Sequence, residues 1–160
     1  MSTKFTRKSP ATRKSPQGSF DLPDSRSLQL VLAMSAFQDQ LVTWLVDKLH
    51  RDGFVGLTGS QLEFLGALDC GPNYAANLAR ALGVTRQAIH KTVRELAQKG
   101  WLRVEADEIK GNQKVINFTI EGERLMAQAR QHFASLDEAL EAEFGEETLE
   151  KITAFLQFRP

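Results

Sequence analysis

The sequence predicts a mainly α-helical fold that includes one small β-hairpin. Apolar residues recur at steps of three and four over most of the 160 residues, as they do in amphipathic helices. Residues 77–102 contain two short helical patterns that are separated by a Gly-containing turn. Two short segments with strand-like alternation follow at once. Helix, turn, helix and hairpin in this order predict a winged helix-turn-helix.

Residues 1–20 are expected to form a disordered basic arm. They are rich in Ser, Thr, Pro and basic side chains and contain almost no apolar ones, so they cannot bury a core. A short repeat occurs at residues 6–10 and 12–16. Two interpretations stay open, a solubilising tail or an arm that lies along DNA phosphates or in the minor groove. The candidate contacts of the arm are Lys4, Arg7, Lys8, Arg13 and Lys14.

Residues 25–51 predict a long amphipathic helix that ends near Gly53. Val31, Val42 and Val46 make its apolar stripe wider than one face of a thin domain needs. The extra width favours packing against a partner subunit, and a broad contact with the protein's own core is the alternative. The main stripe comprises Leu30, Met34, Phe37, Leu41, Leu45 and Leu49.

A shorter helix is expected over residues 58–68. Thr58 with Gln61 can form a capping box at its start, in which each residue satisfies a backbone N–H of the other. Ser60 with Glu63 offers the same arrangement two residues later. The side chains expected to face the core are Leu62, Phe64, Leu65 and Leu68.

The helix-turn-helix pattern begins after a Gly-Pro-Asn break at residues 71–73. Gly83 follows the first helix, at the position where helices commonly end in a left-handed residue. Val84 is expected to fill the angle between the helices. Thr85 offers its side-chain oxygen as the N-cap of a second helix, residues 85–99. The apolar stripe of the first helix comprises Leu78, Ala79 and Leu82.

The second helix is predicted to read DNA. Its inward face is apolar and comprises Ile89, Val93, Leu96 and Ala97. The candidate DNA contacts are Thr85 at its start and then Arg86, Gln87, His90, Lys91 and Arg94. Such side chains can donate to guanine edges, pair with adenine or hold phosphates. Arg86 and Gln87 lie in the first turn, the part of a recognition helix that reaches base edges. An ordinary solvated helix face is the alternative.

The hairpin that follows is a candidate wing. Residues 101–106 alternate between apolar and polar side chains, as a half-buried strand does. A turn is expected at 110–113 and a second strand at 114–119. Lys110 and Lys114 are candidate phosphate contacts.

Two further helices are expected after the wing. Thr119 can cap the first of them, which runs to about residue 144 and has two Glu residues in its first turn. Gly145 separates it from a last helix at residues 146–158. The apolar residues of the last helix are Leu149, Ile152, Phe155 and Leu156.

Three phrases, in their order and spacing, resemble the MarR (multiple antibiotic resistance regulator) family of bacterial transcription regulators. They are LTGSQLEFLGAL (Leu57 to Leu68), LARALGVTRQAIHKTVRELAQKGWL (Leu78 to Leu102) and VINFTIEGERL (Val115 to Leu125). The similarity extends over most of residues 28–156. It implies a winged helix-turn-helix DNA-binding lobe at 54–119, and a homodimer held by N- and C-terminal dimerisation helices at 25–51 and 120–158.

The resemblance also implies a palindromic operator, because a two-fold dimer presents two recognition helices to two half-sites. Many family members bind small aromatic acids between the dimer helices and the lobe, so a small-molecule effector is implied, although no residue here identifies it. The family usually has Asp-x-Arg in the wing, whereas these positions hold Lys110, Gly111 and Asn112 here. A wing Arg contact is therefore not expected, and a Lys contact to phosphate is weaker because Lys acts as a point charge.

Charge is distributed unevenly along a chain whose formal net charge is zero. Residues 1–20 hold five basic and no acidic side chains, and residues 74–114 hold eight basic and four acidic ones. Residues 115–160 hold four basic and nine acidic side chains. The predicted DNA-reading segment is thus basic inside an acidic body, as expected when one face meets phosphate.

Several other classes of protein are disfavoured. A single cysteine, Cys70, excludes an internal disulfide or a cysteine metal cluster, and with no adjacent base it is expected to be a buried or idle thiol. The sequence has no Gly-rich phosphate loop and no His-x-x-x-His, so no enzyme activity, cofactor or metal is expected. His50 and His132 are expected to be a helix-terminal charge partner and a surface residue. No apolar run could span a membrane or act as a signal peptide, which predicts a cytoplasmic protein.

The sequence thus predicts a dimeric, sequence-specific DNA-binding transcription regulator, with the helix at 85–99 in the major groove of a palindromic operator. The alternative is a winged-helix protein-interaction module with weak or no DNA binding, which docks partners on its acidic C-terminal helices. The absent wing Arg and the zero net charge give the alternative slight support.

Overall fold

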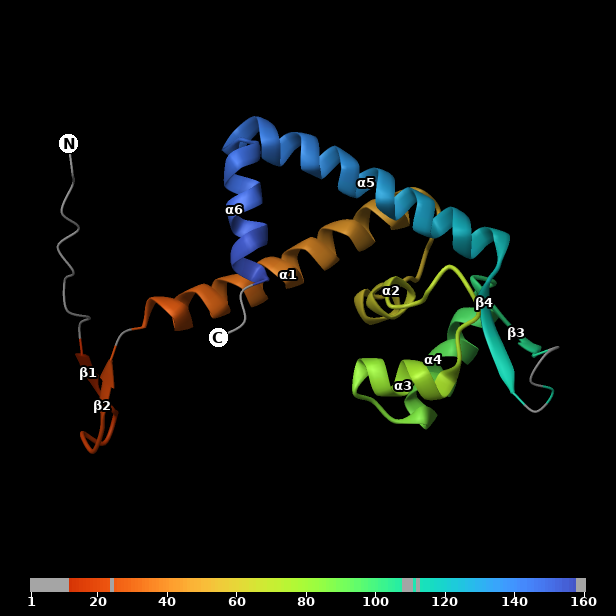
Figure 1. Ribbon diagram of the computed structural model, residues 1–160, viewed down its shortest axis with the longest axis horizontal. Coiled ribbons are helices and arrows are strands. Elements are labelled where there is room, and N and C mark those ends of the chain that lie inside the picture. The colour runs from red at the N-terminus through yellow and green to blue at the C-terminus, as the bar shows by residue number, and fades with distance from the viewer. Residues whose placement is uncertain (1–11, 24, 108–110, 112, 158–160) are drawn as a thin grey trace. The chain divides into compact units, whose positions relative to one another are not determined.

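The computed structural model describes residues 12–23, 25–107, 111 and 113–157, and within them it is mainly helical with two antiparallel hairpins (Figure 1). The elements are β1 (Thr12–Lys14), β2 (Asp21–Pro23), α1 (Arg26–Arg51), α2 (Gly59–Gly66), α3 (Ala75–Leu82), α4 (Arg86–Gln98), β3 (Leu102–Ala106), β4 (Lys114–Phe118), α5 (Ile120–Phe144) and α6 (Glu146–Leu156). The predicted fold class is confirmed. The chain divides after Leu41 into two units, which are described separately.

The first unit contains a short hairpin that the sequence does not predict. Strands β1 and β2 pair antiparallel, whereas disorder is expected over residues 1–20. The Ser15 carbonyl accepts from the backbone N–H of Gly18 at 2.7 Å, so Pro16 stands at the second position of a tight turn, where its fixed φ is favourable. The Ser15 hydroxyl also accepts from the backbone N–H of Phe20 at 3.1 Å. Turn chemistry thus outweighs the low apolar content of this segment.

The first part of α1 leaves its apolar side chains in solvent. The helix begins where the Ser25 hydroxyl accepts from the backbone N–H of Leu28 at 3.2 Å. Leu30, Met34 and Phe37, all members of the predicted stripe, are 40%, 38% and 51% exposed. Within the described part of the first unit, these three side chains are therefore exposed.

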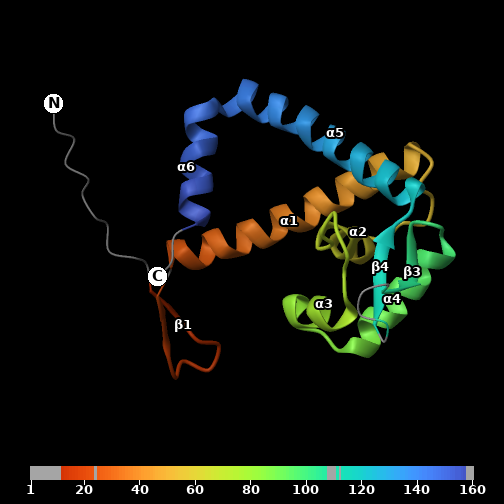
Figure 2. The same cartoon turned by 45° about the vertical axis from the view of Figure 1, so that its right-hand side comes forward.

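The second unit has a continuous core. Helices α1, α2, α4 and α5 each contribute a fully buried leucine to it, namely Leu49, Leu65, Leu96 and Leu125. Figure 2 shows α2, α3, α4 and the β3–β4 hairpin gathered together while α5 runs away from them. The predicted inward face of α4 is confirmed, because Ile89 and Val93 are also buried. Ala97 is only half-buried.

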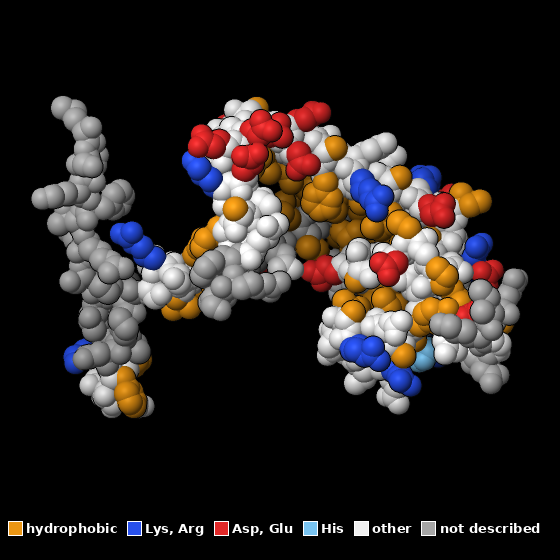
Figure 3. Space-filling view, viewed as in Figure 1, with side chains coloured by type: hydrophobic (Ala, Val, Ile, Leu, Met, Phe, Trp, Pro, Cys, Tyr) orange, Lys and Arg blue, Asp and Glu red, His pale blue; other side chains and the backbone are white. Residues whose placement is uncertain are grey.

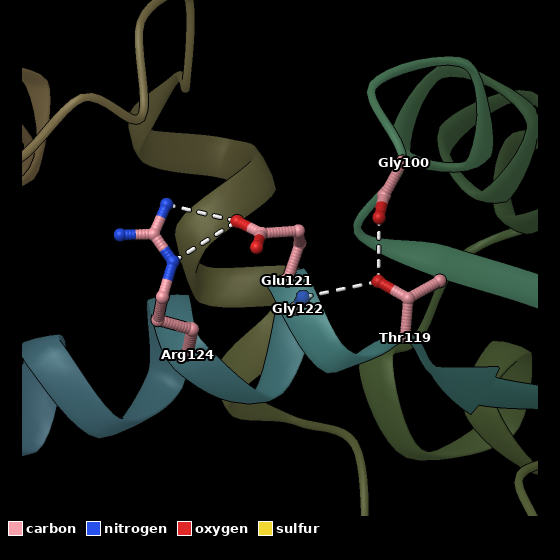
Figure 4. A network of polar contacts seen from close by, with 5 residues as sticks. All are labelled: Gly100, Thr119, Glu121, Gly122 and Arg124. Carbon is pink, nitrogen blue, oxygen red and sulfur yellow. Dashed lines mark hydrogen bonds and ion pairs between the residues drawn. The ribbon is translucent and has the colours of Figure 1, made fainter.

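A compact joint connects the end of α4, the start of β3 and the start of α5 (Figure 4). The Thr119 hydroxyl donates to the Gly100 carbonyl and accepts from the backbone N–H of Gly122 at 3.1 Å. Thr119 also donates its own N–H to the Trp101 carbonyl at 3.1 Å. A Cβ added at Gly122 would lie 2.0 Å from that carbonyl oxygen. Only glycine therefore lets the first turn of α5 approach the wing this closely.

Helices α5 and α6 carry acidic and exposed apolar surface. Acidic side chains gather where α5 turns into α6, with apolar side chains nearby (Figure 3). No residue of α6 is buried. Its side chains Ile152, Phe155 and Leu156 are 50%, 52% and 53% exposed. About half of each of these side chains therefore faces solvent in the single chain.

Candidate nucleic-acid interface

The helix-turn-helix is built by local signals that the sequence shows. Helix α3 ends at Gly83, which adopts a left-handed conformation with φ of 65°. The Val84 N–H then donates to the Ala79 carbonyl at 3.0 Å, a bond that closes the end of the helix. The Thr85 hydroxyl accepts from the Ala88 N–H at 3.2 Å and starts α4. The Thr85 hydroxyl is thus engaged in capping.

The outward face of α4 presents five of the predicted DNA contacts on one helix. They are all exposed, and they comprise Arg86, Gln87, His90, Lys91 and Arg94. Lys91 lies 4.0 Å from Glu95, one turn further along α4. The pair is solvent-exposed, so it contributes little and leaves the Lys91 ammonium accessible. Figure 3 shows Lys and Arg side chains over the region of α3 and α4.

The turn itself is less buried than the sequence predicts. Leu82 and Val84 are 38% and 45% exposed, although the sequence places Leu82 on the apolar stripe and Val84 between the helices. Leu82 is the last residue of α3, so its side chain lies beyond the part of the helix that packs on the core. Both side chains line a groove of about 470 Å³, whose walls include Phe64 of α2 and Ala88 of α4.

The hairpin after α4 has the connectivity of a wing. Strands β3 and β4 pair antiparallel, with Leu102 opposite Phe118 and Ala106 opposite Lys114. Asn73 forms an isolated antiparallel bridge to β4, because its N–H donates to the Ile116 carbonyl and its C=O accepts from the Ile116 N–H. Lys114 is exposed at the start of β4. Lys110 lies outside the described residues, as do Lys4, Arg7 and Lys8 of the arm.

Two residues of the arm fall within the hairpin of the first unit. Arg13 lies in β1, opposite Leu22. Lys14 pairs with Asp21 in the same ladder and its side chain is exposed. The structure thus gives the C-terminal part of the predicted arm a regular backbone.

A polar contact ties the wing to the N-terminus of α3. The Tyr74 hydroxyl donates to Oδ2 of Asp107 at 2.7 Å, and Asp107 is 7% exposed. The hydrogen bond to Asp107 raises the pKa of the Tyr74 phenol above its ordinary value of 10.0, and burial and the carboxylate charge act in the same direction. Tyr74 stands at the N-cap position of α3, so this bond connects the helix-turn-helix to the end of β3.

A second polar cluster holds α4 against α2, and the sequence identifies only its capping part. Gln61 completes the capping box with Thr58, which is one of the two predicted boxes. Its side chain also donates to Glu95 at 3.2 Å and accepts from Lys99 at 2.7 Å. The sequence signal that could have revealed these contacts of Gln61 is the pair Glu95 and Lys99. The two residues are four apart, on the side of α4 between its buried and outward faces.

The structure adds contacts for two of the histidines and exposes the cysteine, which the sequence predicts to be a buried or idle thiol. His50 bonds to the Leu57 carbonyl at 2.8 Å, so it is a local hydrogen-bonding residue. His132 forms a 2.6 Å contact with Asp52 rather than standing alone on the surface. Cys70 is exposed. In the described part of the chain, no group of three His, Cys, Asp or Glu residues could hold a metal ion. None of the helices described there is long and apolar enough to cross a membrane.

These elements define a winged helix-turn-helix, the class that the sequence predicts. Residues 55–108 match the model of the MarR family, which confirms the resemblance that the sequence phrases carry. The matched segment spans α2, α3, α4 and the first strand of the wing.

Solved structures share the fold. MarR from E. coli in its apo form is 17% identical, with a TM-score of 0.65 over 85% of this chain and 97% of that chain. RV1404 from Mycobacterium tuberculosis is 20% identical, with a TM-score of 0.65 over 82% and 92%. A mutant of E. coli MarR complexed with operator DNA is 18% identical, with a TM-score of 0.62 over 81% and 89%. No curated protein sequence gives a significant match.

Proposed function

We propose that the chain is a dimeric, sequence-specific DNA-binding transcription regulator. Helix α4 enters the major groove of a palindromic operator, and DNA and a second copy of the chain are its partners. The cytoplasm, where such a regulator meets DNA, is the proposed location. The proposal assigns the chain no enzymatic role.

The observation that carries the proposal is the outward face of α4. Arg86 and Gln87 are exposed in the first turn after a capped N-terminus, which is where recognition helices contact bases. The groups that could hold phosphates lie beyond them on the same face, and no described acid other than Glu95 lies on α4. One protein of the same fold was crystallised with operator DNA, which supports this use of the face.

Dimerisation is supported by the exposed apolar residues of the terminal helices. Leu30 and Phe37 in α1, and Phe155 in α6, are each at least 40% exposed in the single chain. Full burial of a side chain of this size from water is worth about 1.5–3 kcal/mol, so a second copy that covers the exposed part of each one gains a share of that free energy. A two-fold dimer then carries two copies of α4, which matches two half-sites about one DNA turn apart.

The first test is a mobility shift with duplexes that the wild-type protein selects from a random-sequence pool. Arg86→Ala and Gln87→Ala are expected to reduce the preference for the selected duplex over a scrambled one by about 1–3 kcal/mol, as loss of a base contact does. Arg130→Ala on α5 and Gln98→Ala at the far end of α4 are matched controls, because both side chains are exposed outside the proposed base-reading set.

An unchanged preference in both α4 variants would show that this helix is not the reader. If the wild-type protein selects no duplex at all, the interaction module with acidic docking helices becomes the better description.

The arm is proposed to add sequence-independent affinity. Five basic residues precede the first acidic residue of the chain, Asp21. Each phosphate that the arm neutralises steepens log K against log salt by roughly 0.9. Deletion of residues 1–17 is therefore expected to weaken binding to selected and scrambled duplexes by similar factors, and to flatten the salt dependence. A deletion protein with the full-length affinity and slope would make these residues a tail without a role in binding.

A further inference from the structure

Gln61 is a buried amide that joins α2 to the proposed recognition helix. Gln61 is 7% exposed, and its side chain bonds to Glu95 of α4 and to Lys99, the C-cap residue of α4. The Nε2 atom donates to Oε2 of Glu95 at 3.2 Å, and Oε1 accepts from Nζ of Lys99 at 2.7 Å. The same Oε1 caps α2 by accepting from the N–H of Thr58 at 3.4 Å.

Lys99 is itself held from several directions. Besides Gln61, its ammonium donates to the Gly56 carbonyl, which precedes α2. It also lies 5.2 Å from the centre of the Trp101 ring, within the range of a cation–π contact. Glu95 and Lys99 are four residues apart, so they stand one above the other on one side of α4. This side of α4 is therefore anchored by directional bonds.

Apolar packing alone does not set the rotation of a helix sharply. The buried face of α4 comprises Ile89, Val93 and Leu96, and the hydrophobic effect that buries them has no direction. A helix with its side chains is about 10–12 Å wide, so a rotation of about 20° moves a side chain at its surface by about 2 Å. Hydrogen bonds to bases tolerate much less, because donor and acceptor must lie roughly 2.7–3.2 Å apart.

We propose that Gln61 is a positioning residue for DNA reading, because its two bonds fix the rotation of α4 and thereby aim Arg86 and Gln87 at the base edges. Gln61 contacts no DNA itself. The inference rests on the proposed function, and it assigns sequence specificity in part to a residue of α2 that is buried beside the recognition helix.

The test uses full-length protein, with the duplex selected by the wild type and a scrambled duplex as probes. Gln61→Met keeps the length and bulk of the side chain and removes both bonds. Gln61→Glu places a carboxylate against Glu95 while it still accepts from Lys99. Adding Glu95→Gln restores complementarity, because the new amide donates to the new carboxylate. Glu95→Gln alone is the matched control, since Gln61 can still donate to its amide oxygen.

Gln61→Met and Gln61→Glu are each expected to lower the ratio of selected to scrambled affinity by about tenfold, roughly the loss of one base contact. The slope of log K against log salt stays unchanged, because no phosphate contact is removed. The double variant is expected to recover the ratio to within about twofold of Glu95→Gln alone, as a double-mutant cycle of two touching groups predicts. The ratio is measured on one preparation, so it does not depend on the fraction of folded protein.

An unchanged ratio in Gln61→Met, or a double variant as unspecific as Gln61→Glu, would overturn the inference. If the wild type selects a duplex and Arg86→Ala relaxes specificity while the Gln61 variants do not, only the positioning role fails. If the wild-type protein selects no duplex from the random-sequence pool, the proposed function as a sequence-specific regulator fails, and the positioning role of Gln61 fails with it.

Discussion

The winged lobe, residues 54–119, and the terminal helices differ in how completely they bury their apolar side chains. Leu57, Leu65 and Leu96 of the lobe are at most 2% exposed. In the terminal helices, Phe37 of α1 and Phe155 of α6 are about half exposed. The apolar side chains of the lobe therefore lie in the core of the second unit, whereas the outer parts of α1 and α6 leave theirs exposed.

The polar groups show the same contrast. The buried side chains Gln61, Asn73 and Asp107 of the lobe all have hydrogen-bond partners. Within the part of the chain that is described, no buried side-chain nitrogen or oxygen lacks one. The terminal helices instead carry surface pairs such as Lys151 with Glu147, which contribute little. The residues that bury the core of the lobe and those left exposed on the terminal helices are thus separate sets, so folding of the lobe and the proposed dimerisation can be tested independently.

The largest expected effect is at the joint between the lobe and α5. Gly122→Ala places a methyl group 2.0 Å from the Trp101 carbonyl oxygen, so α5 or the wing must shift. We expect the free energy of unfolding to fall by about 3 kcal/mol, the upper part of the usual range for overpacking. Gly66→Ala in α2 is the matched control, because nothing lies within 4 Å of its added Cβ. Chemical denaturation should show that control at or above wild-type stability.

The second-largest expected effect is on the proposed dimer, with no change in the folding of the lobe. Leu30→Glu and Phe155→Glu each put a charge on an exposed apolar surface of a terminal helix, so they should weaken the dimer while the lobe stays folded. The loss of one buried side chain corresponds to about 2 kcal/mol of association free energy. Light scattering at several protein concentrations measures the fraction of dimer. The affinity for the operator should fall as this fraction falls. A dimer that persists in both variants would remove these helices from the interface.

The smallest expected effect is on the pKa of the Tyr74 phenol. Tyr74 is the single tyrosine of the chain, and its bond to Asp107 raises the pKa of the phenol in the folded state above 10.0. The resulting stabilisation is complete below the unfolded pKa and is lost as pH rises through the folded one. Ultraviolet absorbance of the phenolate should therefore show a midpoint above 10.0, which Asp107→Asn lowers and Glu105→Gln on the exposed wing surface leaves unchanged. Equal midpoints in all three proteins would contradict the link between Tyr74 and the wing.

The sequence alone determined the elements that depend on near neighbours. Gly83 ends α3, and Thr85 and Thr119 cap α4 and α5, because each of these signals acts within four residues of itself. The 3.6-residue period likewise identified the two faces of α4, since a helix of known start has only one way to distribute its side chains. The candidate DNA-reading residues on the outward face were predictable for this reason.

Only the tertiary structure decided the contacts between distant segments. Gln61 looks like a capping residue in the sequence, and its bond to Glu95 spans 34 residues. His132 looks like a surface residue, and its partner Asp52 is 80 residues away. Such bonds require two helices to pack at one separation and rotation, which no local pattern of residues encodes. The sequence therefore determined which side chains α4 presents on its outward face, and tertiary packing decided what holds them in place.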